Sequence, residues 1–207
     1  MTVLWLVPLA AYLLGSIPFG YVIVKLRQGG DVRSSGSGNI GATNVSRVAG
    51  PLAGIVTLLL DAGKGYLAVW AAGRLTGGST RWIALAGLAA IIGHLYPVWI
   101  GFRGGKGVAT AVGVFVPICW QAVGVAALLW LAVVGAWRYI SLASVVAAAA
   151  LPLLTYLLYA PGYAPPHSVS LATSLAAALI ILKHRANLER LLHGNENRLG
   201  ARRSKTR

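Results

Sequence analysis

The chain has 207 residues, of which 57% are hydrophobic and only 11% are charged, and its mean hydropathy is +0.72. A solvated surface needs more charge than this, so the composition excludes a soluble globular protein. The single cysteine, Cys119, excludes an internal disulfide and a cysteine metal cluster. The net charge of +14 is compatible with nucleic acid, anionic lipid or an anionic substrate as the partner, so the positions of the charges must decide.

Long apolar stretches follow one another along the chain. The first, Val3–Val24, has no charged residue, and its 22 residues cross the roughly 30 Å hydrocarbon core of a bilayer when helical. No basic residue precedes it and no clear small-residue cleavage site accompanies it, so we interpret it as a retained transmembrane helix. The second, Pro51–Gly73, is interrupted only by Asp61 and Lys64. These two residues stand three apart and are predicted to neutralise each other.

Three further apolar stretches complete the predicted membrane region, at residues 82–102, 107–137 and 139–182. The last is too long for one helix and is predicted to form two spans, divided by Pro161, Gly162, Pro165 and Pro166. The middle stretch is ambiguous, since it forms either one long helix or two short helices broken near Pro117.

The basic residues decide between these alternatives, because Lys and Arg accumulate on the cytoplasmic side of membrane helices. Seven helices with the N-terminus outside place 15 basic residues inside and only Arg74 and Arg81 outside, whereas six helices give at best 11 against 6. We therefore predict an all-α integral membrane protein with seven transmembrane helices, its N-terminus outside and its C-terminus cytoplasmic. Residues 1–197 form the membrane domain, and residues 198–207 form a basic cytoplasmic tail.

Polar residues gather in three segments at the predicted cytoplasmic face, and the first runs from residue 35 to residue 47. Glycines such as Gly38 let the backbone approach a ligand, and backbone N–H groups leading into a helix N-terminus favour an anion. This pattern predicts a phosphate-binding loop, with a flexible connection as the alternative, although it matches neither a Walker loop nor a dinucleotide fingerprint. The side chains available to the anion are those of Ser37, Asn39, Thr43, Asn44 and Arg47.

The second polar segment, at residues 93–110, begins within the end of the third apolar stretch. Gly104 and Gly105 precede Lys106 there, which places an ammonium group on a backbone able to fold closely around an oxyanion. His94 lies inside the preceding helix, where a polar ring needs a partner. It either makes a structural hydrogen bond or belongs to the site.

The third polar segment begins where the last span leaves the membrane, at residues 184–196. His184 and Asn187 stand on one helical face, which can therefore enter a site. The alternative is an amphipathic tail that lies on anionic lipid. The four acidic residues of the chain form no obvious ligand cluster, so no metal is predicted.

These segments resemble the bacterial acyl-phosphate:glycerol-3-phosphate acyltransferase family, in order along almost the whole chain. The motifs that carry the resemblance are GSIPFGYVI at 15–23, SGSGNIGATNVSR at 35–47, DAGKG at 61–65, GHLYPVWIGFRGGKGVAT at 93–110, RYISLAS at 138–144 and HRANLERLLHGNE at 184–196. The resemblance implies a multi-pass enzyme of the bacterial cytoplasmic membrane with its active site at the cytoplasmic face. It would transfer a fatty acyl group from acyl phosphate to sn-glycerol 3-phosphate, giving lysophosphatidic acid and phosphate, the entry step of phospholipid synthesis.

The same resemblance assigns residues and partners. It implies catalytic roles for Ser37, Lys106, His184 and Asn187 and substrate binding by Arg47, Thr43, Asn44, Gly104 and Gly105, to which the first polar segment adds Gly38 and Asn39. The partners are acyl phosphate, glycerol 3-phosphate and membrane lipids, with no nucleic acid, cofactor or metal. The proton of the acceptor hydroxyl would pass either to His184 or to a phosphate oxygen of the substrate.

Two other classes of protein share some of these features. A transporter of small anions or phosphate esters also needs apolar helices with cationic groups, but such proteins tend to have repeated halves and a site near the midplane of the membrane. A scaffold that binds lipid enzymes through its basic tail would leave the glycine-rich segments unexplained.

Overall fold

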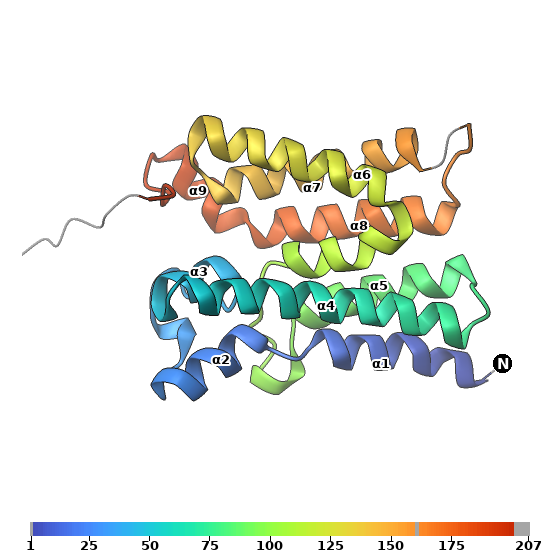
Figure 1. Ribbon diagram of the computed structural model, residues 1–207, viewed down its shortest axis with the longest axis horizontal. Helices are drawn as coiled ribbons and strands as arrows, with labels where there is room; N and C mark the ends of the chain where they lie inside the picture. Colours follow the sequence, from blue (N-terminus) through green and yellow to red (C-terminus); the bar gives the residue numbers. More distant parts are fainter. Residues whose placement is uncertain (1, 160–161, 201–207) are drawn as a thin grey trace, which may run out of the picture.

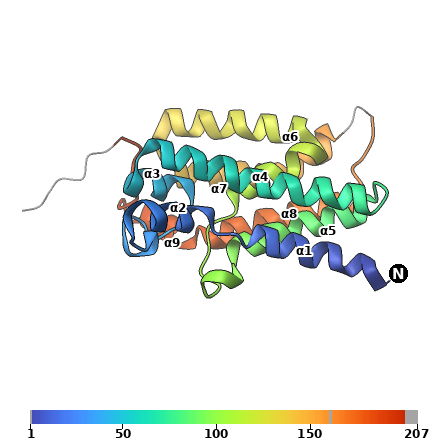
Figure 2. The ribbon, with the colours of Figure 1, turned by 60° about the horizontal axis from the view of Figure 1, so that its bottom comes forward.

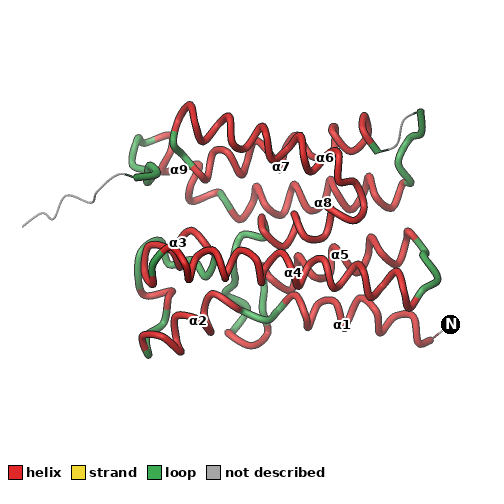
Figure 3. Tube along the Cα trace, in the orientation of Figure 1, coloured by secondary structure: helices red, strands yellow, loops and turns green. Residues whose placement is uncertain are grey.

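The computed structural model describes residues 2–159 and 162–200, and its regular elements are helices (Figures 1 and 3). The all-α prediction is therefore confirmed. Short 3-10 turns occur at Thr2–Trp5, Val32–Ser34 and Val98–Ile100. The α-helices are α1 (Leu6–Gly15), α2 (Phe19–Gln28), α3 (Ala42–Ala49), α4 (Pro51–Leu75), α5 (Thr80–Leu95), α6 (Val108–Trp137), α7 (Ile140–Leu158), α8 (His167–Lys183) and α9 (Arg185–Leu192).

Several helical runs are long and apolar enough to cross a membrane. By length and composition they are Leu6–Gln28, Pro51–Leu75, Thr80–Ile100, Val108–Trp137 and Ile140–Leu158, and α8 with α9, bent by 54° between them, makes a sixth. The prediction of an integral membrane protein agrees with this pattern. These criteria give five or six spans in the described residues, however, and not the predicted seven.

The number of spans depends on whether α6 is counted as one helix or as two. Cys119 has φ −151° and ψ 62°, which are not helical angles, and the chain reverses its direction there (Figures 1 and 2). Pro117 lies two residues earlier and has no N–H to donate to the helical ladder, which weakens the helix at this point. The ambiguous stretch is thus two arms that run in opposite directions, broken two residues beyond the position that the sequence predicts.

The helices form two groups (Figure 1). Helices α1 to α5 make one group, while the second arm of α6 makes the other with α7, α8 and α9, and the first arm of α6 lies between them. The packing between α4 and the first arm is backbone against backbone, because a Cβ atom on Gly113 would overlap the carbonyl of Ala62. Small residues at helix interfaces permit this close approach in membrane proteins.

The connections gather at two opposite ends of the molecule. The start of α1, the turn between α4 and α5 and the start of α8 lie at one end, whereas α3 and α9 lie at the other (Figure 1). Residue 161, one of the predicted helix breakers, and residues 201–207 of the predicted tail lie outside the described residues.

The first residues of the predicted tail contact the segment that joins α6 to α7. The N–H of Leu199 donates to the carbonyl of Arg138 at 2.7 Å, and Nε of Arg198 donates to the hydroxyl of Tyr139 at 2.9 Å. Residues 198–200 therefore belong to the folded part of the chain. The count of basic residues predicts a basic tail but carries no information about this contact.

The close approach of α4 and α6 is testable with two glycines of the same helix. Gly113→Ala should lower the free energy of unfolding by about 1–3 kcal/mol, because the added methyl group forces the two backbones apart. Gly124→Ala is the matched control, since a Cβ atom there meets nothing within 4 Å. Thermal unfolding of both variants in detergent compares them, and equal stabilities would contradict this description of the interface.

Candidate active site

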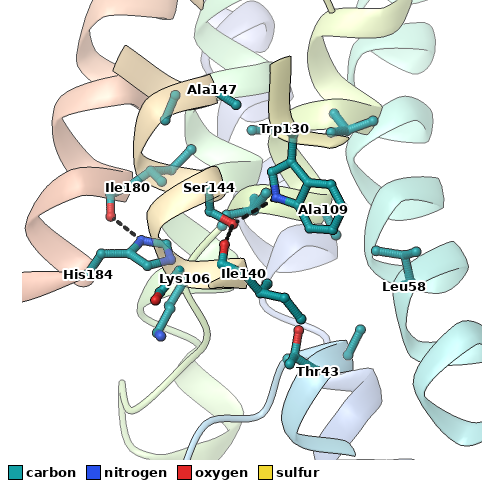
Figure 4. Close-up of a pocket in the computed structure, with 18 of the residues that line it drawn as sticks. Thr43, Leu58, Lys106, Ala109, Trp130, Ile140, Ser144, Ala147, Ile180 and His184 are labelled. Carbon is teal, nitrogen blue, oxygen red and sulfur yellow. Dashed lines mark hydrogen bonds between the residues drawn. The ribbon is translucent and has the colours of Figure 1, made fainter. Parts of the chain in front are cut away.

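A cavity of about 600 Å³ opens among α3, α4, α6, α7, α8 and α9 (Figure 4). It brings together most of the predicted site residues, namely Ser37, Asn39, Thr43, Asn44, Arg47, Lys106, His184 and Asn187. These residues come from all three polar segments, which lie up to 150 residues apart in the chain. Gly38 and Gly104 border a neighbouring cavity with Arg103 and Lys183, and Gly105 lines neither.

Asn44 organises the first polar segment. Its side-chain amide is buried and donates to the carbonyls of Val32, Ser35 and Asn39 at 3.2, 3.0 and 2.9 Å, while Oδ1 accepts the N–H of Ser37 at 2.7 Å. One amide thus ties the loop to the first turn of α3. These bonds engage both ends of the amide within the loop, so Asn44 acts here by shaping the binding surface.

Two glycines give the loop backbone angles that other residues rarely adopt. Gly36 and Gly38 have φ of 65° and 70°, in the left-handed region that other residues rarely adopt. In this loop conformation Ser37 and Arg47 line the cavity. Within the described residues, neither side chain makes a hydrogen bond or ion pair. A hydroxyl group and a guanidinium therefore remain available to a bound anion.

The second polar segment packs on His94. The N–H of Gly105 donates to the carbonyl of His94 at 3.0 Å, and a Cβ atom on Gly105 would overlap the imidazole ring. A Cβ atom on Gly104 would overlap the same carbonyl. The two glycines therefore hold the loop against α5, and their backbone carries Lys106 into the cavity. Their predicted contact with substrate stays a prediction.

Lys106 is the cation at the centre of the polar end. The pKa of its ammonium group is lowered to about 8, mainly by burial, with Glu196 raising it and Arg190 and Arg47 lowering it. Its Nζ donates to Oδ1 of Asn187. An ammonium with this pKa changes charge close to physiological pH.

Glu196 anchors the third polar segment and was not singled out by sequence reasoning. It accepts hydrogen bonds from Nδ2 of Asn187 at 2.7 Å, Nε of Arg190 at 2.7 Å and Oγ of Ser141 at 2.9 Å. Burial alone would raise the pKa of this carboxyl, but the three hydrogen bonds outweigh it and hold the pKa below its usual value. The only signal in the sequence was an acidic residue that ends a basic motif.

His184 stands at the bend between α8 and α9. Its Nδ1 lies 2.8 Å from the carbonyl of Ile180, and because a carbonyl only accepts, Nδ1 carries the proton (Figure 4). The lone pair of Nε2 is then able to accept a hydrogen bond. Since the ring lines the cavity together with Lys106, it is in a position to orient a hydroxyl group.

The predicted pair of Asp61 and Lys64 is present. Their Oδ1 and Nζ lie 2.8 Å apart, and Nζ also donates to the carbonyl of Ile17 at 2.7 Å, between α1 and α2. His94 joins them, with Nδ1 at 3.5 Å from the same carboxylate oxygen. His94 is buried and also borders the cavity, so its part in the site stays a prediction.

Comparisons with known proteins identify the family. A family model described as glycerol-3-phosphate acyltransferase matches residues 5–194. The chain belongs to the glycerol-3-phosphate acyltransferase family. It is 46% identical over 190 residues to the glycerol-3-phosphate acyltransferase of Mesorhizobium japonicum, covering 92% of this chain and 93% of that protein. It is 45% identical over 202 residues to the enzyme of Syntrophotalea carbinolica, covering 97% of this chain and all of that one.

Two solved structures of a member of the glycerol-3-phosphate acyltransferase family share this fold. Both are crystal structures of PlsY (YgiH), described as an integral membrane glycerol 3-phosphate acyltransferase. The glycerol 3-phosphate form is 42% identical with a TM-score of 0.88, and the match covers 95% of this chain and 96% of that one. The lysophosphatidic acid form is 41% identical with a TM-score of 0.85 and covers 95% of each chain.

The charge of Lys106 predicts how this acyltransferase-family site binds an anion. Burial has lowered the pKa, so the cation is present below about pH 8 and is lost as the pH rises through that value. Inorganic phosphate should bind about tenfold more weakly at pH 9 than at pH 7, measured by calorimetry on the detergent-solubilised protein.

The control for this pH dependence is Lys106→Arg, because a guanidinium stays protonated throughout this range. The variant should bind phosphate with an affinity that changes little between the two pH values. An identical pH profile for the variant and the wild type would show that another group controls binding.

Proposed function

We propose that the cavity transfers a fatty acyl group from acyl phosphate to sn-glycerol 3-phosphate, forming lysophosphatidic acid and phosphate. The proposal rests on one observation: the cavity has a polar end, with Arg47 and Lys106, and is lined mainly by apolar side chains elsewhere. A phosphate with a lipid tail needs both parts. The lysophosphatidic acid form of the 41% identical PlsY structure supports the same assignment.

The chemistry of the transfer requires positioning more than activation. Acyl phosphate is a mixed anhydride and is already reactive, so binding both phosphates and orienting the acceptor supply a large part of the catalysis. The acceptor hydroxyl oxygen bonds to the acyl carbon, and the bond from that carbon to the phosphate oxygen breaks. Lys106 and Arg47 balance the phosphate charge, with Ser37 as a hydrogen-bond donor.

The proton of the acceptor hydroxyl completes the balance. It passes to an oxygen of the departing phosphate, which becomes a basic anion as its bond to the acyl carbon breaks. Nε2 of His184 accepts a hydrogen bond from the hydroxyl and orients it. Asn187 holds the ammonium group of Lys106 in place, because its amide also contacts the carboxylate of Glu196.

The placement in the membrane belongs to the same proposal. Counting the two arms of α6 separately gives seven crossings, with α1 and α2 as one broken helix, and the reversal at Cys119 supports this count (Figure 2). The end that carries α3, α9 and most of the basic residues then faces the cytoplasm, following the bias of Lys and Arg. The membrane is the bacterial cytoplasmic membrane.

The identity of the acyl donor distinguishes this proposal from acyl transfer that starts from a thioester. Palmitoyl phosphate with glycerol 3-phosphate should release phosphate, palmitoyl-CoA should give no product, and EDTA should change nothing. Lys106→Ala should lower the rate by roughly a hundredfold, because it removes a charge-assisted contact with phosphate. Arg185→Ala, an exposed cation outside the cavity, is the matched control. Comparable rates with the thioester, or inhibition by EDTA reversed by a divalent metal, would contradict the proposal.

The orientation is testable with single cysteines on exposed positions at opposite ends. Tyr163 is 76% exposed before α8, and Leu192 is 87% exposed at the end of α9. In intact cells an impermeant thiol reagent should label Tyr163→Cys but label Leu192→Cys only after lysis. The native Cys119 is buried and provides the background measurement in the wild-type protein. The reverse labelling pattern would exclude this topology.

A further inference from the structure

Trp130 places an aromatic ring at the edge of the cavity. Among the described residues that line it, Trp130 is the only phenylalanine, tyrosine or tryptophan, and small or aliphatic side chains such as Ala126, Ala127, Ala147 and Ala148 surround the apolar part. Its indole ring is held in place. Nε1 donates to Oγ of Ser144 at 3.2 Å, and that hydroxyl donates to the carbonyl of Ile140 at 2.8 Å.

The ring lies where the polar end of the cavity meets the apolar end. Ser141, which donates to Glu196, stands one turn before Ser144 on α7. Ala148 and Leu151 follow Ser144 by four and seven residues, which at about 1.5 Å per residue places them roughly 6 and 10 Å further along the helix. Figure 4 shows Trp130 and Ser144 between Ala147 on one side and Lys106, His184 and Thr43 on the other.

The second arm of α6 presents a continuous face to this apolar region. Val123, Ala126, Ala127, Trp130 and Leu131 all border the cavity, and their spacing of three and four residues puts them on one side of the helix. Val123 and Ala126 are buried, whereas Leu131 is 59% exposed. The indole therefore lies between the polar end and the apolar part of the cavity. That apolar part extends to the buried Val123 on one side and to the exposed Leu131 on the other.

The geometry points to Trp130 as a specificity-determining residue for the acyl donor, an inference that rests on the proposed function. An acyl phosphate whose phosphate lies near Lys106 and Arg47 must lead its chain past the indole. A straight chain passes a flat, fixed ring easily. A chain with a methyl branch close to the carbonyl group meets the ring, which cannot turn aside because Ser144 holds its N–H.

The experiment compares palmitoyl phosphate with phytanoyl phosphate, whose methyl branches begin close to the carbonyl group. The wild-type protein should prefer the straight chain in kcat/KM by at least about tenfold, since one methyl group in a tight apolar pocket discriminates to this degree. Trp130→Ala should reduce this preference at least fivefold, roughly the effect expected from that discrimination. Ser144→Ala should reduce it partly, because the indole keeps its size but loses its anchor. KM for glycerol 3-phosphate should not change in either variant.

Trp120→Ala is the matched control, because this tryptophan lies on the same arm of α6, is 67% exposed and does not border the cavity. It should keep the wild-type preference. A preference in Trp130→Ala equal to that of the wild type would overturn the inference. If Trp130→Ala fails to fold, unchanged preferences in both Trp130→Leu and Ser144→Ala would overturn it equally. A wild-type protein without activity on either donor would instead refute the proposed function.

Discussion

The hydrogen-bonded chain from Lys106 through Asn187 and Glu196 to Arg190 is the interaction on which the rest of the site depends. A charged group at the edge of a hydrocarbon layer is costly unless it is paired. The amide of Asn187 meets this need in two directions, since Oδ1 accepts from the ammonium group and Nδ2 donates to the carboxylate. Replacing it with an apolar side chain would leave both charges without a neutral bridge between them. The short helix α9 is thereby fixed against the loop that precedes α6.

An asparagine amide also organises the first polar segment. There the side chain of Asn44, and not a helix or a strand, provides the hydrogen-bond partners of the backbone groups. Its amide binds three carbonyls and one N–H of the loop. Because those backbone groups are bound to Asn44, the neighbouring side chains of Ser37 and Arg47 are left to face the cavity. Which residues shape the surface and which remain available to a ligand therefore follows from the polar atoms that are already hydrogen-bonded.

Local composition explains how much of this was predictable. Apolar stretches, glycine-rich segments and the Asp61–Lys64 spacing are properties of neighbouring residues, so the sequence predicted the helices, the cluster of polar segments and the buried ion pair. Glu196 was missed because its three hydrogen bonds depend on how the chain turns back after α9 and on Ser141, which is 55 residues away in the chain. The sequence also could not show that Gly104 and Gly105 pack on His94, because this contact depends on how the loop folds back against α5. The break of α6 was predicted from Pro117, but the exact residue depends on packing.

The location of the buried charges explains why one cavity can serve both a phosphate and a lipid chain. Asp61 borders the cavity, but it is almost fully buried and lies 2.8 Å from Lys64, so the two charges largely cancel there. Such a buried pair contributes little net stability, since desolvation offsets the attraction between the two charges. The positive charge that remains on the cavity therefore comes from Arg47 and Lys106 at its polar end. An anionic headgroup is attracted to that end alone, and its attached chain is left against walls that carry no net charge.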